Sequence, residues 1–314
     1  MEFSVRAIAL LTPRVKTFDL APAGNDELPA AAPGAHVLVR VRDRMGMPYE
    51  RAYALCHRPG EGVWRIAVQF EPEGQGGSRF LHETVRVGDR LQVSWSQASF
   101  GLAAAATEHV LIAQGIGIAP ILAMAYALAA RRQPFAAHVG GETGDDMPLA
   151  ETLRAVAKER AHLYTGAAMP LAAILGHPQA GRHAYVCGPD PFIAAVREAA
   201  AAAGWPAGQL HIERLVTPEP RRDDRPVEVV LARSGRSLTV PADRSILAAL
   251  TDAGLSPPCD CRRGACGTCV LPVIEAEGGI DHRDRYLTAA ECDDGKRICV
   301  CVSRPKGGRL VLDF

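Results

Sequence analysis

Residues 261–269 read CRRGACGTC, and this stretch decides the fold of the last part of the chain. It places Cys261, Cys266 and Cys269 at the spacing C-x4-C-x2-C, which is typical of plant-type [2Fe–2S] loops whose remaining ligand lies far along the chain. A loop around such a cluster offers thiolates to iron and backbone N–H groups to sulfide, so it needs small residues between its ligands. Here those small residues are Gly264, Ala265, Gly267 and Thr268.

Two cysteines compete for the last ligand position. Cys299 and Cys301 both lie in ICVCV (298–302), which reads as a strand, and residues two apart in a strand point to the same face. Spacing alone therefore does not choose between them. A zinc site is the alternative, and it is disfavoured because a second short CxxC pair is missing. Its ligands would be Cys259, Cys261, Cys266 and Cys269; the cysteines predicted to be ordinary thiols are Cys56, Cys187 and Cys292.

Composition limits the classes of function. The 314 residues suffice for two or three domains, and the 35 basic and 35 acidic residues balance, so no global field attracts nucleic acid or an anionic membrane. No run approaches the ~18 uninterrupted apolar residues of a membrane span. The start, MEFSVRAIALLTPR, carries charges and Pro13, unlike a secretory signal. We therefore expect a soluble, cytoplasmic protein that binds neither nucleic acid nor membrane.

Hydrophobic patterning divides the chain. Residues 1–103 predict an antiparallel β-barrel, because short β-rich runs alternate with Gly/Pro turns. Residues 104–216 predict a parallel α/β domain that begins with a buried strand, a glycine turn and a helix. Residues 217–226 are rich in proline and charge and read as a linker. Residues 227–314 open with a hairpin that turns at Ser234-Gly235 and lead into the cysteine loop.

Two glycine turns and one strand carry candidate cofactor contacts. GIGIAP (115–120) and VCGP (186–189) each follow a predicted strand of the α/β domain, where backbone N–H groups at a helix start can bind a pyrophosphate. In the barrel segment, RAYAL (51–55) and GQGGS (74–78) pair a cation and an aromatic ring with a glycine-rich turn. These are the parts needed to stack an isoalloxazine ring and bind its phosphate.

Together these segments resemble the phthalate dioxygenase reductase family, which also includes vanillate-demethylase-type reductases. The matching segments are RAYAL, GQGGS, QGIGIAP (114–120), VCGP, CRRGACGTC, DHRD (281–284) and CVSR (301–304). The resemblance implies a ferredoxin-reductase-like flavin barrel, an NAD-binding α/β domain and a C-terminal β-grasp plant-type ferredoxin. It also selects Cys301 as the fourth cluster ligand, because the family places this cysteine directly before Val-Ser-Arg.

The resemblance implies a set of cofactor contacts. It assigns Tyr53 and Cys187 to the reacting flavin and nicotinamide rings. The implied flavin contacts are Arg51, Ala52, Tyr53, Ala54, Gly76, Gly77 and Ser78. The implied nucleotide contacts are Gly115, Gly117, Pro120, Glu142, Thr143, Cys187, Gly188 and Pro189.

Three positions depart from the family pattern. Ala54 replaces a serine near the flavin, and Ala119 replaces a threonine in the pyrophosphate turn. Glu142-Thr143 stands where the family commonly has Arg-Ser near the adenosine ribose. Because a carboxylate accepts hydrogen bonds from ribose hydroxyls but repels a 2′-phosphate, we predict NADH over NADPH.

The resemblance further implies what the chain does. NADH would reduce flavin, FMN rather than FAD because the compact chain resembles the FMN members, and electrons would pass through the [2Fe–2S] cluster to a terminal oxygenase. That partner would be a Rieske non-haem iron enzyme acting on an aromatic substrate, or less often a cytochrome P450. Arg262, Arg263 and Arg304 are candidate docking residues for an acidic partner. A non-enzymatic iron–sulfur carrier or redox sensor is the alternative.

Overall fold

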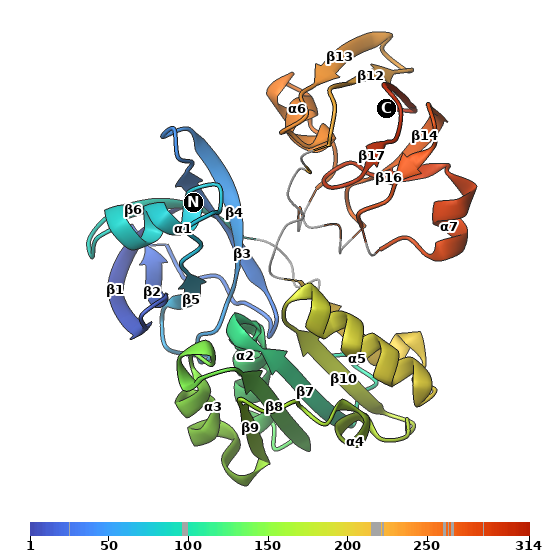
Figure 1. Ribbon diagram of the computed structural model, residues 1–314. Helices are drawn as coiled ribbons and strands as arrows, with labels where there is room; N and C mark the ends of the chain where they lie inside the picture. The colour runs from blue at the N-terminus through green and yellow to red at the C-terminus, as the bar shows by residue number, and fades with distance from the viewer. Residues whose placement is uncertain are drawn as a thin grey trace. The chain divides into compact units, whose positions relative to one another are not determined.

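The computed structural model describes residues 1–24, 26–95, 100–214, 221, 223–259, 262, 264, 267–284 and 286–314. The chain forms two compact units, Met1–Leu215 and Val216–Phe314, shown in Figure 1. Cys261 and Cys266 lie outside the described residues.

An antiparallel barrel opens the first unit, as the sequence predicted. Its strands run in the order β4-β3-β6-β1-β2-β5, and an isolated bridge between Leu55 and Ile66 links its two ends. The stacked rings of Phe3 and Trp64, 4.9 Å between centroids, lie in its apolar core. The strands are β1 (Glu2–Thr12), β2 (Val15–Pro22), β3 (His36–Arg42), β4 (Pro48–Ala54), β5 (Trp64–Gln69) and β6 (Arg90–Trp95).

A short helical segment joins β5 to β6 and follows the glycine turn. It consists of α1 (Gly77–Arg79) and η1 (Phe80–Thr84). Gly76, which precedes it, has φ +108°, and an added Cβ there would lie 2.6 Å from the backbone nitrogen of Arg44. Only glycine fits such a conformation and such a close approach.

A five-stranded parallel sheet completes the first unit, again as predicted. Its order is β11-β10-β7-β8-β9, and every pairing is parallel. Helices α2 and α3 pack on one face and α4 and α5 on the other (Figure 1). The strands are β7 (Glu108–Gln114), β8 (Phe135–Gly141), β9 (Ala161–Thr165), β10 (Arg182–Cys187) and β11 (Leu210–Glu213). The helices are η2 (Gly115–Gly117), α2 (Ile118–Ala130), η3 (Gly144–Asp146), α3 (Ala150–Ala157), η4 (Lys158–Arg160), α4 (Leu171–Leu175), α5 (Asp190–Ala202) and η5 (Ala207–Gln209).

Helix α2 connects the barrel to the sheet through one apolar core. Ten of its thirteen residues are buried, which is expected of a helix covered on more than one side. The same core contains Ala54 and Cys56 from the barrel together with Leu111 and Tyr185 from the sheet. The barrel and the sheet therefore form a single unit.

The second unit has the β-grasp arrangement predicted for a ferredoxin. Its main sheet has the order β13-β12-β18-β14-β16, and β15 pairs with β17 separately. The predicted hairpin is present, and Ser245 caps α6 by accepting a hydrogen bond from the Ala248 N–H. The elements are β12 (Val227–Leu231), β13 (Arg236–Val240), α6 (Ile246–Asp252), β14 (Val270–Ala276), β15 (Ile280–Asp281), α7 (Ala289–Asp294), β16 (Arg297–Cys299), β17 (Arg304–Pro305) and β18 (Arg309–Leu312).

The expectation that ICVCV is one strand was wrong. Strand β16 ends at Cys299, and the N–H groups of Val302 and Ser303 both donate to the Cys299 carbonyl oxygen, at 3.1 and 2.9 Å. The chain therefore turns, and Cys301 lies in that turn instead of sharing a strand face with Cys299.

None of the helices in the described parts of the chain is long and apolar enough to cross a membrane.

A pair of stacked histidines spans two strands of the parallel sheet. His138 on β8 stacks on His162 of β9 with 4.7 Å between ring centroids, and its Nδ1 lies 3.0 Å from the Tyr164 hydroxyl. Burial, reinforced by the nearby charges of His162 and Arg182, lowers the pKa of His138 to about 4.

This pKa predicts a loss of stability in acid. Above about pH 6.5, His138 is neutral in both folded and unfolded chains. Between about pH 6.5 and 4 the unfolded chain binds a proton that the folded chain excludes, so the free energy of unfolding falls, by about 1–2 kcal/mol for this partly exposed group. Denaturant titrations at pH 7.5, 6 and 4.5 should show a smaller loss for His138→Gln than for the unmodified protein. The matched control is His177→Gln, on an exposed residue, which should leave the pH dependence unchanged.

Candidate functional site

Strand β4 presents the predicted flavin residues on two faces. Arg51 and Tyr53 share one face, because they are two residues apart, and Ala54 lies on the other. Tyr49 belongs to the first face as well, and the Arg51 guanidinium lies 5.7 Å from its ring centroid. Sequence reasoning missed Tyr49, although the alternation of YERAY (49–53) places it beside Arg51.

The glycine turn meets this strand. The Gly77 N–H donates to the Tyr49 hydroxyl at 2.8 Å, and an added Cβ at Gly77 would lie 2.6 Å from that oxygen and 3.3 Å from Arg51 Cγ. Ser78 Oγ accepts a hydrogen bond from the Glu71 N–H at 3.0 Å. The structure thus brings together the two segments that the sequence paired, and a guanidinium beside small residues at a helix start fits a flavin phosphate.

Tyr53 is suited to stacking more than to proton transfer. Its half-buried ring packs against the barrel core, opposite Val37 of β3. Burial raises the pKa of Tyr53 well above its usual value, and the nearby Arg51 only partly offsets this. The phenol therefore stays protonated at neutral pH and can stack on a ring or donate a hydrogen bond.

The two nucleotide turns touch each other at the carboxyl edge of the parallel sheet. Strands β7 and β10 are neighbours, with Ala113 in register with Cys187. An added Cβ at Gly117 would lie 2.2 Å from the Cys187 carbonyl oxygen and 3.0 Å from the Gly188 nitrogen. Only glycine permits this approach, so the two motifs form one surface at the edge where open α/β sheets bind ligands.

Helices begin directly from both turns. Gly115 has φ +61° and starts η2, which continues into α2 with Pro120 buried in its first turn. Pro189, in extended conformation, immediately precedes α5. The predicted helix-start residues therefore lie where backbone N–H groups are not used within a helix.

Glu142 and Thr143 follow β8 at the same edge but differ in their surroundings. Glu142 is exposed. The Thr143 hydroxyl donates to the Asp146 carboxylate at 2.8 Å and forms a capping box for η3. An added Cβ at Gly115 would lie 3.7 Å from the Asp146 carbonyl oxygen, so this turn adjoins the pyrophosphate turn. Thr143 shapes the turn, while the Glu142 carboxylate faces solvent.

Two of the departures from the family pattern meet in one apolar cluster. Ala54 and Ala119 are both buried in the core around α2, and Cys187 belongs to the same core. The methyl groups of Ala54 and Ala119 cannot hydrogen-bond a cofactor, so a polar contact at these two positions would come from the backbone.

Buried thiols meet in the second unit. Cys269 Sγ lies 3.1 Å from Cys301 Sγ, and both residues are buried, as is Cys299. Hydrogen bonds from the thiols of Cys299 and Cys301 lower the pKa of Cys269. A lowered pKa favours the thiolate, the form that binds iron.

The loop glycines also fit a cluster site. Gly267 has φ +76°, and an added Cβ would lie 2.2 Å from the half-exposed ring of Tyr286. Gly264 has φ +69°, and an added Cβ would lie 2.6 Å from Val302 Cγ2 and 2.9 Å from Asp284 Cα. Larger residues would strain the loop and push these neighbours away. Sequence reasoning missed Tyr286, since only the folded chain brings it against the loop.

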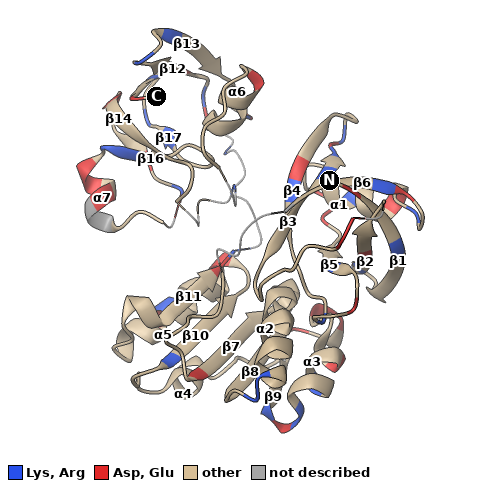
Figure 2. Ribbon diagram, turned by 180° about the vertical axis from the view of Figure 1, so that it is seen from behind, with Lys and Arg blue, Asp and Glu red and all other residues tan. Residues whose placement is uncertain are grey.

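The proposal that Arg304 docks a partner was wrong. Its side chain is buried, and its guanidinium donates to three backbone carbonyl oxygens, so it cannot meet a partner protein. Arg262 is half-buried, and Arg263 lies outside the described residues. On the same unit, Figure 2 shows α7 as acidic, and Glu291 pairs there with Arg297 at 2.7 Å.

Comparisons with known proteins agree with this geometry. Residues 96–210 match the N-terminal domain of dimethylamine monooxygenase subunit DmmA-like proteins, and residues 229–306 match the 2Fe-2S iron-sulfur cluster binding domain. The carnitine monooxygenase reductase subunit of Escherichia coli is 36% identical, with 100% of this chain and 98% of the relative covered. The vanillate O-demethylase oxidoreductase of a Pseudomonas species is 35% identical, with 100% of both covered. The crystal structure of phthalate dioxygenase reductase superposes with a TM-score of 0.82 at 30% identity, over 100% of this chain and 98% of that one.

The chain belongs to the phthalate dioxygenase reductase family. Its C-terminal unit is a [2Fe–2S] ferredoxin domain, and its N-terminal unit has the flavin- and nucleotide-binding reductase fold. As in other members of the family, the chain is an oxidoreductase of an oxygenase system.

The choice of the fourth ligand can be tested within this family frame. Cys301→Ser should abolish the visible and electron paramagnetic resonance signals of the cluster, because Cys301 directly precedes Val-Ser-Arg, as the fourth ligand of the family does, and its thiol lies beside Cys269. Cys299→Ser should retain the signals, because Cys299 closes the strand that pairs with Val270. The reverse pattern would assign the ligand to Cys299. Cys292→Ser, on a helix surface of the same unit, is the matched control.

Proposed function

We propose that the chain is the reductase component of a multicomponent oxygenase. It takes electrons from NADH and passes them through FMN and the [2Fe–2S] cluster to a terminal Rieske non-haem iron oxygenase that acts on an aromatic substrate. The observation that carries this proposal is the meeting of the two nucleotide turns, through Gly117 and Cys187, beside the core that contains barrel residue Ala54. A chain in which the nucleotide turns adjoin the flavin strand can accept electrons from NADH, and its ferredoxin domain can pass them to a partner protein.

The chain's own residues bind and orient the cofactors. When bound, flavin and cluster supply the conversion of a two-electron donor into single electrons. Arg51 and the Gly76-Gly77 turn would hold the flavin phosphate, and the neutral phenol of Tyr53 would lie against the ring. Gly115, Gly117 and Gly188 would admit the dinucleotide to backbone N–H groups. Cys269 and Cys301, with Cys261 and Cys266, would hold the cluster.

Two relatives support an oxygenase partner with an aromatic substrate. Vanillate O-demethylase oxidoreductase and toluene-4-sulfonate monooxygenase system reductase subunits are named for aromatic substrates. FMN follows from the family resemblance, and the cytoplasm as the location of the reaction follows from a sequence without an apolar run long enough for a membrane span.

A haem partner is the second candidate. One relative, from Ectopseudomonas mendocina, is the beta subunit of a heme-dependent oxidative N-demethylase, 36% identical over 100% of this chain. An intact self-sufficient cytochrome P450 monooxygenase also matches all of this chain, with a TM-score of 0.77 at 31% identity, over 41% of its own length. Reduction rates of a purified Rieske oxygenase and a purified P450 by this protein would separate the two partners.

A spectroscopic experiment tests the proposed function. The purified protein should show overlapping flavin and cluster absorption, and anaerobic NADH should bleach both. Heat-released flavin should elute with FMN and not with FAD on a column. A protein without flavin that leaves NADH unoxidised would instead be an iron–sulfur carrier or redox sensor.

Glu142 tests the choice of nucleotide. Because its exposed carboxylate repels a 2′-phosphate, the unmodified protein should favour NADH, and Glu142→Arg should lower the KM for NADPH at least about tenfold, the effect of ~1.4 kcal/mol. Glu151→Arg, on an exposed site of α3, controls for added positive charge. Equal kcat/KM for both nucleotides in the unmodified protein would contradict the assignment.

A further inference from the structure

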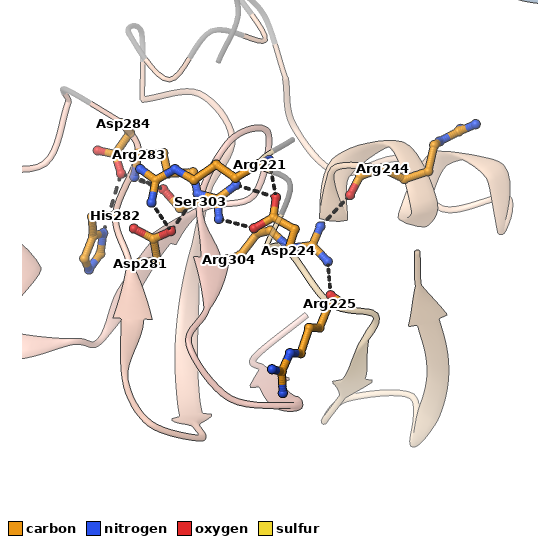
Figure 3. A network of polar contacts seen from close by, with 10 residues as sticks. All are labelled: Arg221, Asp224, Arg225, Arg244, Asp281, His282, Arg283, Asp284, Ser303 and Arg304. Carbon is orange, nitrogen blue, oxygen red and sulfur yellow. Dashed lines mark hydrogen bonds and ion pairs between the residues drawn. The ribbon is translucent and has the colours of Figure 1, made fainter. Parts of the chain in front are cut away.

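A network of charged residues joins the segment before β12 to residues beside β15 and β17 of the ferredoxin unit (Figure 3). Arg283 donates through both Nη atoms to the Asp224 carboxylate, and through Nε to Asp281 at 2.8 Å. The side chains of Arg283 and Asp224 are only 7% and 6% exposed. A buried bidentate pair of this kind has a defined geometry, unlike the solvated ion pairs of a protein surface.

Asp224 lies within the predicted linker, residues 217–226. In this segment Asp224 and its neighbour Arg225 are both hydrogen-bonded to the ferredoxin unit. Arg304 on β17 donates to the Arg225 carbonyl oxygen at 2.8 Å, directly beside the Asp224–Arg283 pair. Arg221 adds a backbone N–H bond to Asp224 at 2.8 Å and a guanidinium bond to Asp281 at 3.1 Å. Hydrogen bonding from Arg283 lowers the pKa of Asp224, so the pair stays ionised at neutral pH.

We call the Asp224–Arg283 pair the anchor. Hydrogen bonds connect the anchor to the cluster loop. The backbone N–H of Arg283 donates to Ser303 Oγ at 3.1 Å, and that hydroxyl donates to Asp284 at 2.9 Å. Ser303 is two residues from Cys301. Asp284 lies against Gly264, where an added Cβ would be 2.9 Å from its Cα. Arg283, which binds Asp224, is thus connected to the turn that carries Cys301 through Ser303 and to the cysteine loop through Asp284 and Gly264.

We propose that Arg283 is a positioning residue for electron transfer. Its pair with Asp224 fixes the segment before β12 to the residues next to the proposed cluster site, Asp284 and Ser303. This inference rests on the proposed function. The second unit begins at Val216, so Asp224 and Arg225 lie near its start, and releasing them lengthens the chain that tethers the flavin-binding unit to the cluster. A longer tether lowers the effective concentration of one redox site at the other, which slows transfer between them.

Three variants test the anchor. Asp224→Asn removes the carboxylate from the linker side and leaves Arg283 paired with Asp281. Arg283→Gln removes the guanidinium, and Arg283→Lys keeps the charge without the bidentate geometry. The matched control is Arg233→Gln, which breaks another two-bond Arg–Asp pair of the same unit, the exposed pair with Asp313.

Limited proteolysis of the holoprotein measures the anchor without reference to activity. Trypsin cleavage after Arg221 should accelerate at least about tenfold in Asp224→Asn, since charge-assisted hydrogen bonds shift a local opening equilibrium by that order. Arg233→Gln should be cleaved at the unmodified rate. Unchanged cleavage in Asp224→Asn would overturn the proposal. If Arg283→Gln fails to retain its cluster, the cleavage rate of Asp224→Asn alone tests whether the anchor exists.

Anaerobic stopped-flow mixing with NADH measures the positioning. In Asp224→Asn and Arg283→Gln, flavin reduction should keep its rate and the cluster spectrum should be unchanged, while reduction of the cluster by flavin slows about three- to tenfold. Arg283→Lys should lie between these variants and the unmodified protein. Faster cleavage with an unchanged flavin-to-cluster rate would overturn the positioning role. Failure of NADH to reduce flavin in the unmodified protein would refute the proposed function itself, a result separate from the proteolysis.

Discussion

The apolar core around α2 is the interaction on which the reductase unit depends. This helix packs against the parallel sheet and against barrel residues such as Ala54, and it begins at the turn whose Gly117 touches Cys187. Burial of α2 on several sides brings the flavin strand and the nucleotide edge into one unit. Because cores of this kind pack as densely as crystals, the spacing between the two cofactor regions cannot vary freely.

Glycine marks the places where backbones approach too closely for a side chain. Gly77 against Tyr49, Gly117 against Cys187 and Gly267 against Tyr286 are such contacts, and each lies at a proposed cofactor region. They join segments distant in sequence, so each glycine is required by its neighbour as much as by its own turn. A side chain larger than hydrogen at any of these glycines would displace the neighbouring backbone or ring.

The ferredoxin unit combines an apolar core with buried charged side chains. Arg283 and Arg304 are buried arginines whose donors are used by carboxylates or carbonyl oxygens, which compensates the cost of removing them from water. Arg304 lies in β17 and Arg283 follows β15, the strand that pairs with β17, two residues after its end. These side chains hold the segment before β12 and adjoin the turn that carries Cys301.

The sequence by itself determined the order of the folds, the cysteine spacing, the glycine turns and the family. These signals are local: period-two alternation, strand–glycine–helix succession and C-x4-C-x2-C each occupy a few consecutive residues. Only the tertiary structure decided that β16 ends at Cys299, that Arg304 is buried, that Tyr49 and Tyr286 adjoin the proposed sites, and that Asp224 is anchored. Each of these features depends on contacts with residues far along the chain. The sequence alone does not distinguish a charged or aromatic residue that faces solvent from one that is buried against a partner.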